Sequence, residues 1–174
     1  QYANMQHFTI TNKGAMIVAL SLGIDYEEVK IFSKKDIRNI EHTVLIGDFH
    51  IGLLKSGYSV LSYTADVHNT VKFKYKLDKV RIEPDGKGEL FSHKTNRNFE
   101  FMMEMDRGGK SYEQMTERIL KYEKYLLSKA YAKEYINFPI IIIVTIGNTR
   151  LTKLKDVVEK QKKTNINFLF TTIE

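Results

Sequence analysis

The sequence predicts an α/β protein in which helices flank a mixed β-sheet, and three features of its pattern support this. Residues 138–146 form a continuous apolar and β-branched run, which is typical of a central strand buried on both faces. Another apolar run at 99–106 follows a shorter one at 88–92, which indicates an antiparallel hairpin. A helical pattern at 112–132 joins 99–106 to 138–146, and such a connection makes strands parallel. Both kinds of pairing then share one sheet, with the element order αβββαβαβ.

In the N-terminal part of the chain, weak alternation predicts a short strand at 7–11. A helix at 15–22 should end at Gly23, a residue that readily adopts the left-handed conformation of a helix C-cap. Ser33 is suited to cap a longer helix that runs to about Lys55. The apolar stripe of that helix is expected to include Ile40, Val44, Ile51 and Leu54.

The remaining elements follow from turn and capping residues. Strands are expected at 58–64 and at 71–83, the latter with a break near Asp78. Ser111 and Gln114 form a capping-box pattern at the start of the helix at 112–132. The core side of that helix should carry Met115, Ile119, Tyr122 and Leu126. The last elements are a helix at 149–162 capped by Asn148 and a strand at 166–173.

Composition limits the functions that are open to the chain. It has 174 residues, a net charge of +6 and no cysteine, so disulfides, thiolate metal sites and a cysteine nucleophile are excluded. The longest apolar run, 138–146, is too short to span a bilayer, and no signal-peptide pattern is present, so we expect a cytoplasmic protein. The basic charge favours a nucleic-acid partner.

The strongest candidate site consists of three acids. Asp85 follows Pro84 at a turn, while Glu104 and Asp106 are two positions apart on a strand and therefore point to the same face. Carboxylates are the ligands that Mg²⁺ prefers, and a bound Mg²⁺ can polarise a phosphate and help to generate hydroxide. We expect Glu41 to supply a further metal ligand. The cations expected to serve the chemistry beside the acids are Arg118 and Lys121.

Clustered basic residues are candidates for phosphate contacts. Lys72, Lys74 and Lys76 alternate with apolar residues, which gives one strand a basic face. The other candidates are Arg107, Lys110, Arg150 and Lys153.

Simpler interpretations of the same residues stay open. Asp85-Gly86 is also a common turn pair, and 106–109 has the composition of a solvated loop with a local ion pair. Glu41 and Asp48 are seven positions apart and could belong to an exposed helix face. The histidines lack the spacing of a zinc helix, and no glycine-rich phosphate loop is present.

The chain resembles two related groups of proteins. Pro84-Asp85 followed by Glu104-Met105-Asp106 is similar to the signature of restriction-endonuclease-like nuclease cores, which is Pro-Asp and then Asp/Glu-x-Lys, except that Asp106 stands in the lysine position. Most of the chain resembles the replication-relaxation family of plasmid and conjugative-element proteins. The motifs that carry this resemblance lie at 8–14, 41–44, 84–86 and 101–108 and in the tyrosine-rich helix after them.

The resemblance implies a domain organisation and a role. Residues 1–25 would be the end of a winged-helix DNA-binding domain, and 26–174 would be a restriction-endonuclease-like α/β domain. Such proteins serve plasmid DNA replication or conjugation, in the manner of mobilisation accessory proteins. The partners implied are DNA and a relaxase or replication protein, with a homodimer as a further option. Arg118 and Tyr122 stand where the family tends to have a lysine four residues before a tyrosine.

We therefore expect a DNA-associated, nuclease-like domain whose catalytic activity is degenerate or absent. One alternative is an active Mg²⁺-dependent DNA endonuclease, for which Mg²⁺ is the only cofactor expected. Another is a protein-interaction or dimerisation module that makes no direct contact with DNA.

Overall fold

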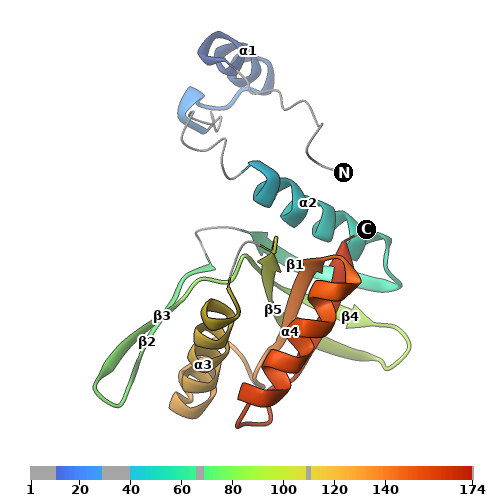
Figure 1. Cartoon of the computed structure of the whole chain (residues 1–174). Coiled ribbons are helices and arrows are strands. Elements are labelled where there is room, and N and C mark those ends of the chain that lie inside the picture. The colour runs from blue at the N-terminus through green and yellow to red at the C-terminus, as the bar shows by residue number, and fades with distance from the viewer. Residues whose placement is uncertain (1–10, 29–39, 66–68, 109–110, 174) are drawn as a thin grey trace. The chain divides into compact units, whose positions relative to one another are not determined.

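The main body of the protein is a five-stranded mixed sheet with the strand order β1-β4-β5-β6-β7. The computed structural model describes residues 11–28, 40–65, 69–108 and 111–173. β1 pairs antiparallel with β4 and β4 antiparallel with β5, whereas β5, β6 and β7 pair in parallel (Figure 1). The strands are β1 (Tyr58–Ala65), β4 (Gly86–Ser92), β5 (Arg97–Asp106), β6 (Ile140–Ile146) and β7 (Phe168–Ile173). The predicted mixed sheet flanked by helices is confirmed.

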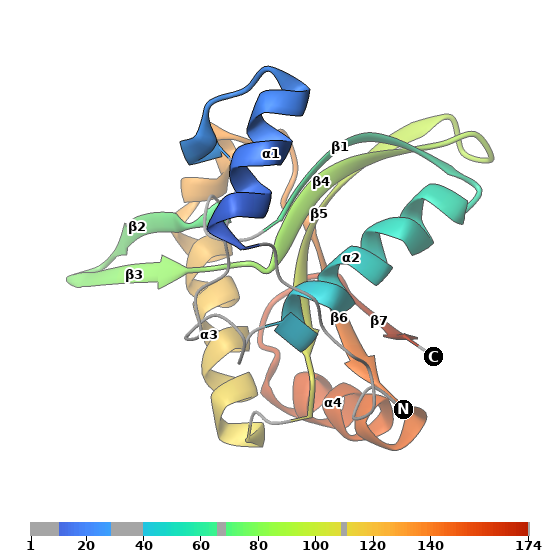
Figure 2. The same ribbon diagram turned by 90° about the horizontal axis from the view of Figure 1, so that it is seen from above.

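Helices cover both faces of this sheet. α3 (Tyr112–Ser128) and α4 (Asn148–Gln161) lie side by side on one face, and α2 (Ile40–Lys55) lies on the other (Figures 1 and 2). Met115 and Ile119 of α3 pack with Leu154 of α4 against Ile143 of β6, and all four side chains are buried. On the opposite face, Phe49 of α2 makes an edge-on ring contact with Phe101 of β5. These contacts fix which side of each strand meets which helix.

The run at 71–83 differs from its prediction. It forms β2 (Val71–Tyr75) and β3 (Asp78–Ile82), an antiparallel hairpin outside the main sheet. The second strand of the main sheet is instead supplied by β4, which the sequence presents as a short addition to the hairpin of β5. A basic alternating strand with one apolar face does not need burial on two sides, so it can form a separate hairpin packed on a helix.

Capping residues set the helix ends, with two differences from prediction. The Ser111–Gln114 capping box at the start of α3 is confirmed, since both of its hydrogen bonds are present. α3 ends at Ser128 because Lys129 is left-handed (φ 55°), and a short 3₁₀ helix, Ala130–Lys133, follows. The N-cap of α4 is Gly147, with a φ of 78°, and not Asn148, which is the first helical residue.

The stripe predicted for α2 is wrong over its second half. Ile51 and Leu54 are 50% and 61% exposed, and the buried residues of α2 are Leu45, Ile46 and Phe49. Apolar residues occur all round this helix, so their spacing alone does not select the face that meets the sheet. The predicted end of the helix at Lys55 is confirmed.

The chain divides into two compact units, Gln1–Val44 and Leu45–Glu174. In the first unit, α1 (Asn12–Leu22) begins three residues before its predicted start, after the N-cap Thr11, and ends at a left-handed Gly23, as predicted. A short 3₁₀ helix, Tyr26–Glu28, follows it. The strand expected at 7–11, apart from Thr11, and the cap expected at Ser33 lie outside the described residues. None of the helices searched in the described ranges is both long and apolar enough to cross a membrane.

Candidate functional site

The candidate site is built on the carboxyl end of β5. Side chains alternate along this strand, so Phe101 points towards α2 while Glu104 and Asp106 point towards α3 and α4. The predicted common face of the two acids is therefore observed. β6 lies beside them in parallel, with Ile143 opposite Glu104 and Thr145 opposite Asp106.

Asp85 joins the acids from the loop between β3 and β4. Its Oδ2 accepts a hydrogen bond of 2.8 Å from the backbone N–H of Met105, the residue between Glu104 and Asp106. The register that pairs Gly86 with Met103 brings the turn to this point. The sequence thus places Asp85 and Glu104 correctly at one end of the sheet.

Arg118 of α3 lies between Asp85 and Glu104. Its Nη1 forms an ion pair with Glu104 Oε2 and lies 3.9 Å from Asp85 Oδ2. The Glu104 side chain is only 4% exposed. Its other oxygen accepts a 2.8 Å hydrogen bond from the Tyr122 hydroxyl, one turn further along α3. Burial raises the pKa of Tyr122, although the charge of Arg118 partly opposes this, so the hydroxyl stays a donor at neutral pH.

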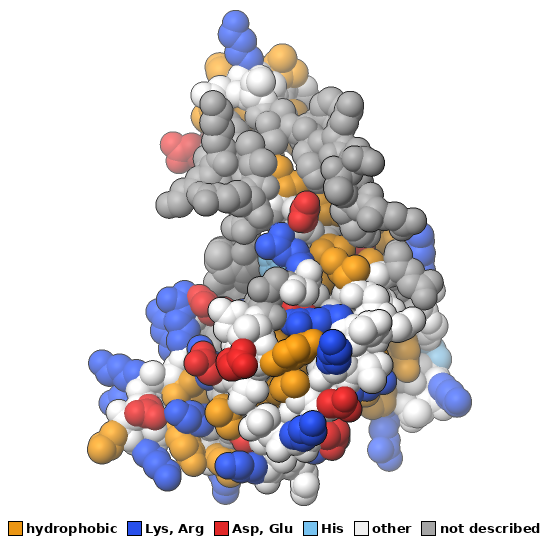
Figure 3. Space-filling view, viewed as in Figure 1, with side chains coloured by type: hydrophobic (Ala, Val, Ile, Leu, Met, Phe, Trp, Pro, Cys, Tyr) orange, Lys and Arg blue, Asp and Glu red, His pale blue; other side chains and the backbone are white. Residues whose placement is uncertain are grey.

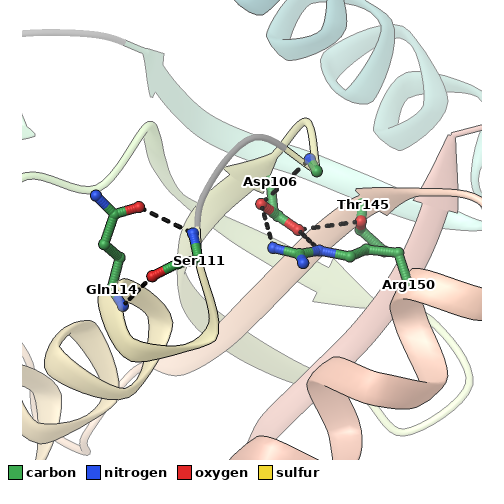
Figure 4. Close-up of polar contacts among 6 residues, drawn as sticks. Asp106, Ser111, Gln114, Thr145 and Arg150 are labelled. Atoms are coloured by element: carbon green, nitrogen blue, oxygen red, sulfur yellow. Dashed lines mark hydrogen bonds and ion pairs between the residues drawn. The ribbon is translucent and has the colours of Figure 1, made fainter.

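Asp106 is held by a different arginine (Figure 4). Its carboxylate accepts two hydrogen bonds from Arg150 of α4, from Nε at 2.7 Å and from Nη2 at 3.3 Å. Thr145 and the backbone N–H of Gly108 each add a bond of 3.3 Å. The hydrogen bond with Asp106 raises the pKa of Arg150, whose guanidinium also lies 4.6 Å from the centre of the Tyr112 ring. Such a two-bond pair fixes the start of α4 against β5.

A small cavity of about 40 Å³ opens beside this cluster. Glu104, Arg118 and Tyr122 line its inner part, and the end of β3 lines the rest with Arg81, Ile82 and Glu83. Lys121 lines it as well and is exposed, so the predicted pair of cations, Arg118 and Lys121, is found at the acids.

The acids predicted on α2 occupy different places. Asp48 lines a larger hollow of about 660 Å³ on the α2 face of the sheet, together with apolar residues such as Phe99 and Ile142. It therefore lies on the face opposite to the one that carries Glu104. Glu41 lies in the first turn of α2, within the N-terminal unit, and its role as a metal ligand stays a prediction.

The candidate phosphate-binding residues are mostly on the surface. Lys72 and Lys74 are exposed on β2, and Lys76 is exposed in the turn that follows. Arg107 and Lys153 are exposed as well, while Arg150 is only 16% exposed and is occupied with Asp106. Lys110 lies outside the described residues. Figure 3 shows several Lys and Arg side chains gathered over the β2–β3 hairpin, at the left.

Sequence reasoning did not single out Tyr63 of β1. Its hydroxyl is buried, and no hydrogen-bond partner is found for it within the described part of the chain. Burial, and then the nearby charge of Asp85, raises the pKa of Tyr63 to about 12. A Cβ at position 86 would lie 3.0 Å from this hydroxyl, so Gly86 leaves room for the ring. No sequence motif marks Tyr63, because only the pairing of β1 with β4 brings it close to the Pro84-Asp85 turn.

The three acids do not fit a Mg²⁺ site in this arrangement. A divalent ion between Asp85 and Glu104 would have to displace the Arg118 guanidinium, and Asp106 already accepts bonds at both oxygens. Across the described ranges, no three His, Cys, Asp or Glu side chains are grouped to hold a metal ion. Comparisons of the chain with protein-family models, with curated proteins and with solved structures find no match.

Proposed function

We propose that the unit 45–174 is a restriction-endonuclease-like domain that associates with DNA and does not cleave it. The observation that carries this proposal is the position of Arg118, whose guanidinium pairs with Glu104 and lies 3.9 Å from Asp85, where a nuclease of this type would bind its metal. The active Mg²⁺-dependent endonuclease is the alternative that this observation disfavours.

The order of the elements supports the restriction-endonuclease-like assignment. The main sheet and its helices follow one another in the chain in a fixed order. Helix α2 comes first, then the three antiparallel strands β1, β4 and β5, then α3, the parallel strand β6, α4 and the parallel strand β7. Pro84-Asp85 precedes the second of these strands, and Glu104 lies two residues before the end of the third. The two acids of the signature thus meet at one sheet end, as that kind of core requires.

The chemistry of the two arginines supports the absence of cleavage. A guanidinium stays protonated at any physiological pH, so Arg118 cannot take up a proton from an attacking water. Its positive charge also offsets one of the two carboxylate charges and repels a dication, which weakens the attraction for Mg²⁺. The lysine position holds Asp106, which is bound to Arg150 and adds no positive charge of its own.

Association with DNA is supported by charge and by exposure. The chain carries a net charge of +6, and the exposed basic residues beside the site include Lys121 and Arg107. Basic surfaces of this kind bind the phosphate backbone with a strong dependence on salt. By its resemblance to replication-relaxation proteins, we place this activity in plasmid replication or transfer, with a relaxase or replication protein as the partner.

A direct test combines DNA binding with a cleavage assay. We expect labelled duplex DNA to bind the wild-type chain in EDTA without any divalent ion, with an affinity that falls steeply as salt rises and that Mg²⁺ lowers as any competing cation does. Supercoiled plasmid should stay intact in Mg²⁺ or Mn²⁺. Asp85→Ala and Glu104→Ala serve as controls for any cleavage that is seen.

Two results would contradict the proposal. Metal-dependent nicking by the wild type that disappears in both alanine variants would establish the active endonuclease. No measurable DNA binding at low salt would favour the protein-interaction or dimerisation module. Nicking that persists unchanged in both variants would indicate a contaminating nuclease, and the binding result would then decide.

A further inference from the structure

The β2–β3 hairpin has two faces of opposite character. In its register Val71 faces Ile82 and Phe73 faces Val80, whereas Lys72 faces Arg81 and Lys74 faces Lys79. From these contacts we propose that the hairpin is a DNA-binding arm, which lies with its basic face along the phosphate backbone. This inference deepens the proposed function and rests on it, and it adds Lys79 and Arg81 to the lysines predicted from sequence.

The apolar face holds the arm in place. Val71 and Ile82 are buried in a core cluster with Tyr122 and Tyr125 of α3, and the Phe73 ring lies 5.1 Å from that of Tyr125. An ion pair of 3.0 Å between Lys124 of α3 and Asp78 adds a polar contact at the turn. The hairpin extends from α3, away from the main sheet, in both ribbon views (Figures 1 and 2).

The basic face carries a cost in the free protein. Lys72 and Arg81 are directly opposite each other, as are Lys74 and Lys79, and all four are exposed. Like charges in such cross-strand positions destabilise a hairpin. Arg81 has an ion pair with Glu83, whereas no acidic partner is found for Lys74 or Lys79 among the described residues. A polyanion bound along this face would attract each of these cations and so offset their mutual repulsion.

The tip of the hairpin also has features that suit contact with DNA. Tyr75 and Asp78 enclose a two-residue turn in which Lys76 has a φ of 53°. This left-handed conformation suits Gly or Asn, so a lysine there is held at a conformational cost. The next residue, Leu77, is fully exposed. The tip thus presents a cation and an apolar side chain, which suits contact with a phosphate and with the wall of a groove.

The arm leads towards the site. Arg81 lines the small cavity that Glu104, Arg118 and Lys121 also line, so basic side chains continue from the hairpin to the arginine between the acids. Side chains two apart on a strand, such as Lys72 and Lys74, are about 7 Å apart. One strand of duplex DNA carries a phosphate about every 3.4 Å along the axis, so the arm can follow its backbone without reading its sequence.

The test compares two variants of equal charge. One is Lys72→Gln, Lys74→Gln, Lys79→Gln, which removes both like-charge pairs. The other is Lys94→Gln, Arg97→Gln, Lys133→Gln, whose positions are exposed and belong to other elements: the β4–β5 turn, β5 and the 3₁₀ helix after α3. Each chain is titrated with labelled duplex DNA of random sequence by fluorescence anisotropy over a range of salt, and its melting temperature is measured.

We expect the hairpin variant to bind DNA about 10- to 100-fold more weakly at moderate salt, with a salt slope smaller by roughly two to three. Its melting temperature should be equal to or higher than that of the wild type, because repulsion is removed. The control variant should keep most of the affinity. A merely structural hairpin would give a lower melting temperature and no specific loss of affinity.

The outcomes separate this inference from the proposed function. If the wild type binds DNA and the two variants bind it with equal affinity, the hairpin is not a DNA-binding arm, but the proposed association with DNA is unaffected. If the wild type does not bind DNA, both proposals fail. In that case hairpin-dependent binding to vesicles of phosphatidylcholine and phosphatidylserine would assign the basic face to a lipid surface instead.

Discussion

At the scale of single residues, two buried tyrosine hydroxyls near the acids have opposite environments. The Tyr122 hydroxyl donates a hydrogen bond to Glu104, whereas no partner is found for the Tyr63 hydroxyl among the described residues. A buried polar group without a partner has lost its bonds to water and gained nothing in return. Removing the two hydroxyls should therefore change stability in opposite directions.

We expect Tyr63→Phe to raise the free energy of unfolding by about 1 kcal/mol, because the unpartnered oxygen disappears while the ring contacts stay. Tyr122→Phe should lower it by roughly 1.5–3 kcal/mol, since it removes a bond to a charged acceptor. Urea unfolding followed by circular dichroism measures both. A loss of stability in Tyr63→Phe equal to that in Tyr122→Phe would mean that the Tyr63 hydroxyl has a partner in solution.

The sequence predicts the acidic site better than it predicts the bonds within it. Asp85 and Glu104 come together as expected because a turn residue and a strand end are fixed by local pattern. Arg118 is placed near them by the helix that follows β5. The bond between Asp106 and Arg150 could not be foreseen, because it joins residues 44 positions apart and depends on which helix covers which strand.

At the scale of elements, β4 and β5 carry a pair of like charges. Glu89 lies directly opposite Glu100 in the antiparallel register. Partial burial, and then the charge of Glu89, raises the pKa of Glu100 above its ordinary value. The folded protein therefore binds a proton at Glu100 more tightly than the unfolded chain does. Ionised Glu100 therefore lowers the free energy of unfolding. This cost is absent at low pH and grows as the pH rises through the ordinary pKa of the carboxyl and then through its raised pKa.

Glu100→Gln should remove that penalty. We expect the variant to exceed the wild type in unfolding free energy by about 0.2–1 kcal/mol at neutral pH, and by nothing at a pH below the ordinary carboxyl value. Glu113→Gln is the control of opposite sign, because a hydrogen bond with Ser111 lowers the pKa of Glu113. That variant should be less stable than the wild type at neutral pH and equal to it in acid. A pH-independent difference for Glu100→Gln would contradict this explanation.

Element boundaries followed the sequence where local residues decide them. Ser111 and Gln114 start α3 because their side chains form the capping box. Gly23 ends α1 because glycine readily adopts the left-handed conformation that the C-cap requires. The sequence indicates a break near Asp78 but not a two-residue hairpin turn, since Lys76-Leu77 contains none of the residues that normally mark a tight turn. The face that α2 buries depends on packing with the sheet and not on its own periodicity.

At the scale of the whole molecule, the charges of unit 45–174 are arranged in two ways. Acids at the carboxyl end of the sheet are buried and neutralised by arginines, whereas the lysines of the hairpin are exposed and face one another. The first arrangement leaves each buried charge paired, whereas the second costs stability until an anion binds. Together they fit the role proposed above, in which the domain holds DNA beside a site that takes no metal.

The most direct test of this claim is a calorimetric titration of the wild-type chain with Mn²⁺. Because Arg118 already occupies the space between Asp85 and Glu104 and pairs with Glu104, we expect no saturable binding at this site, and the same heats in the double variant Asp85→Ala, Glu104→Ala. Saturable binding of one ion by the wild type that is lost in the double variant would contradict the claim. It would mean that the guanidinium yields its place to a metal and that the domain retains a nuclease centre.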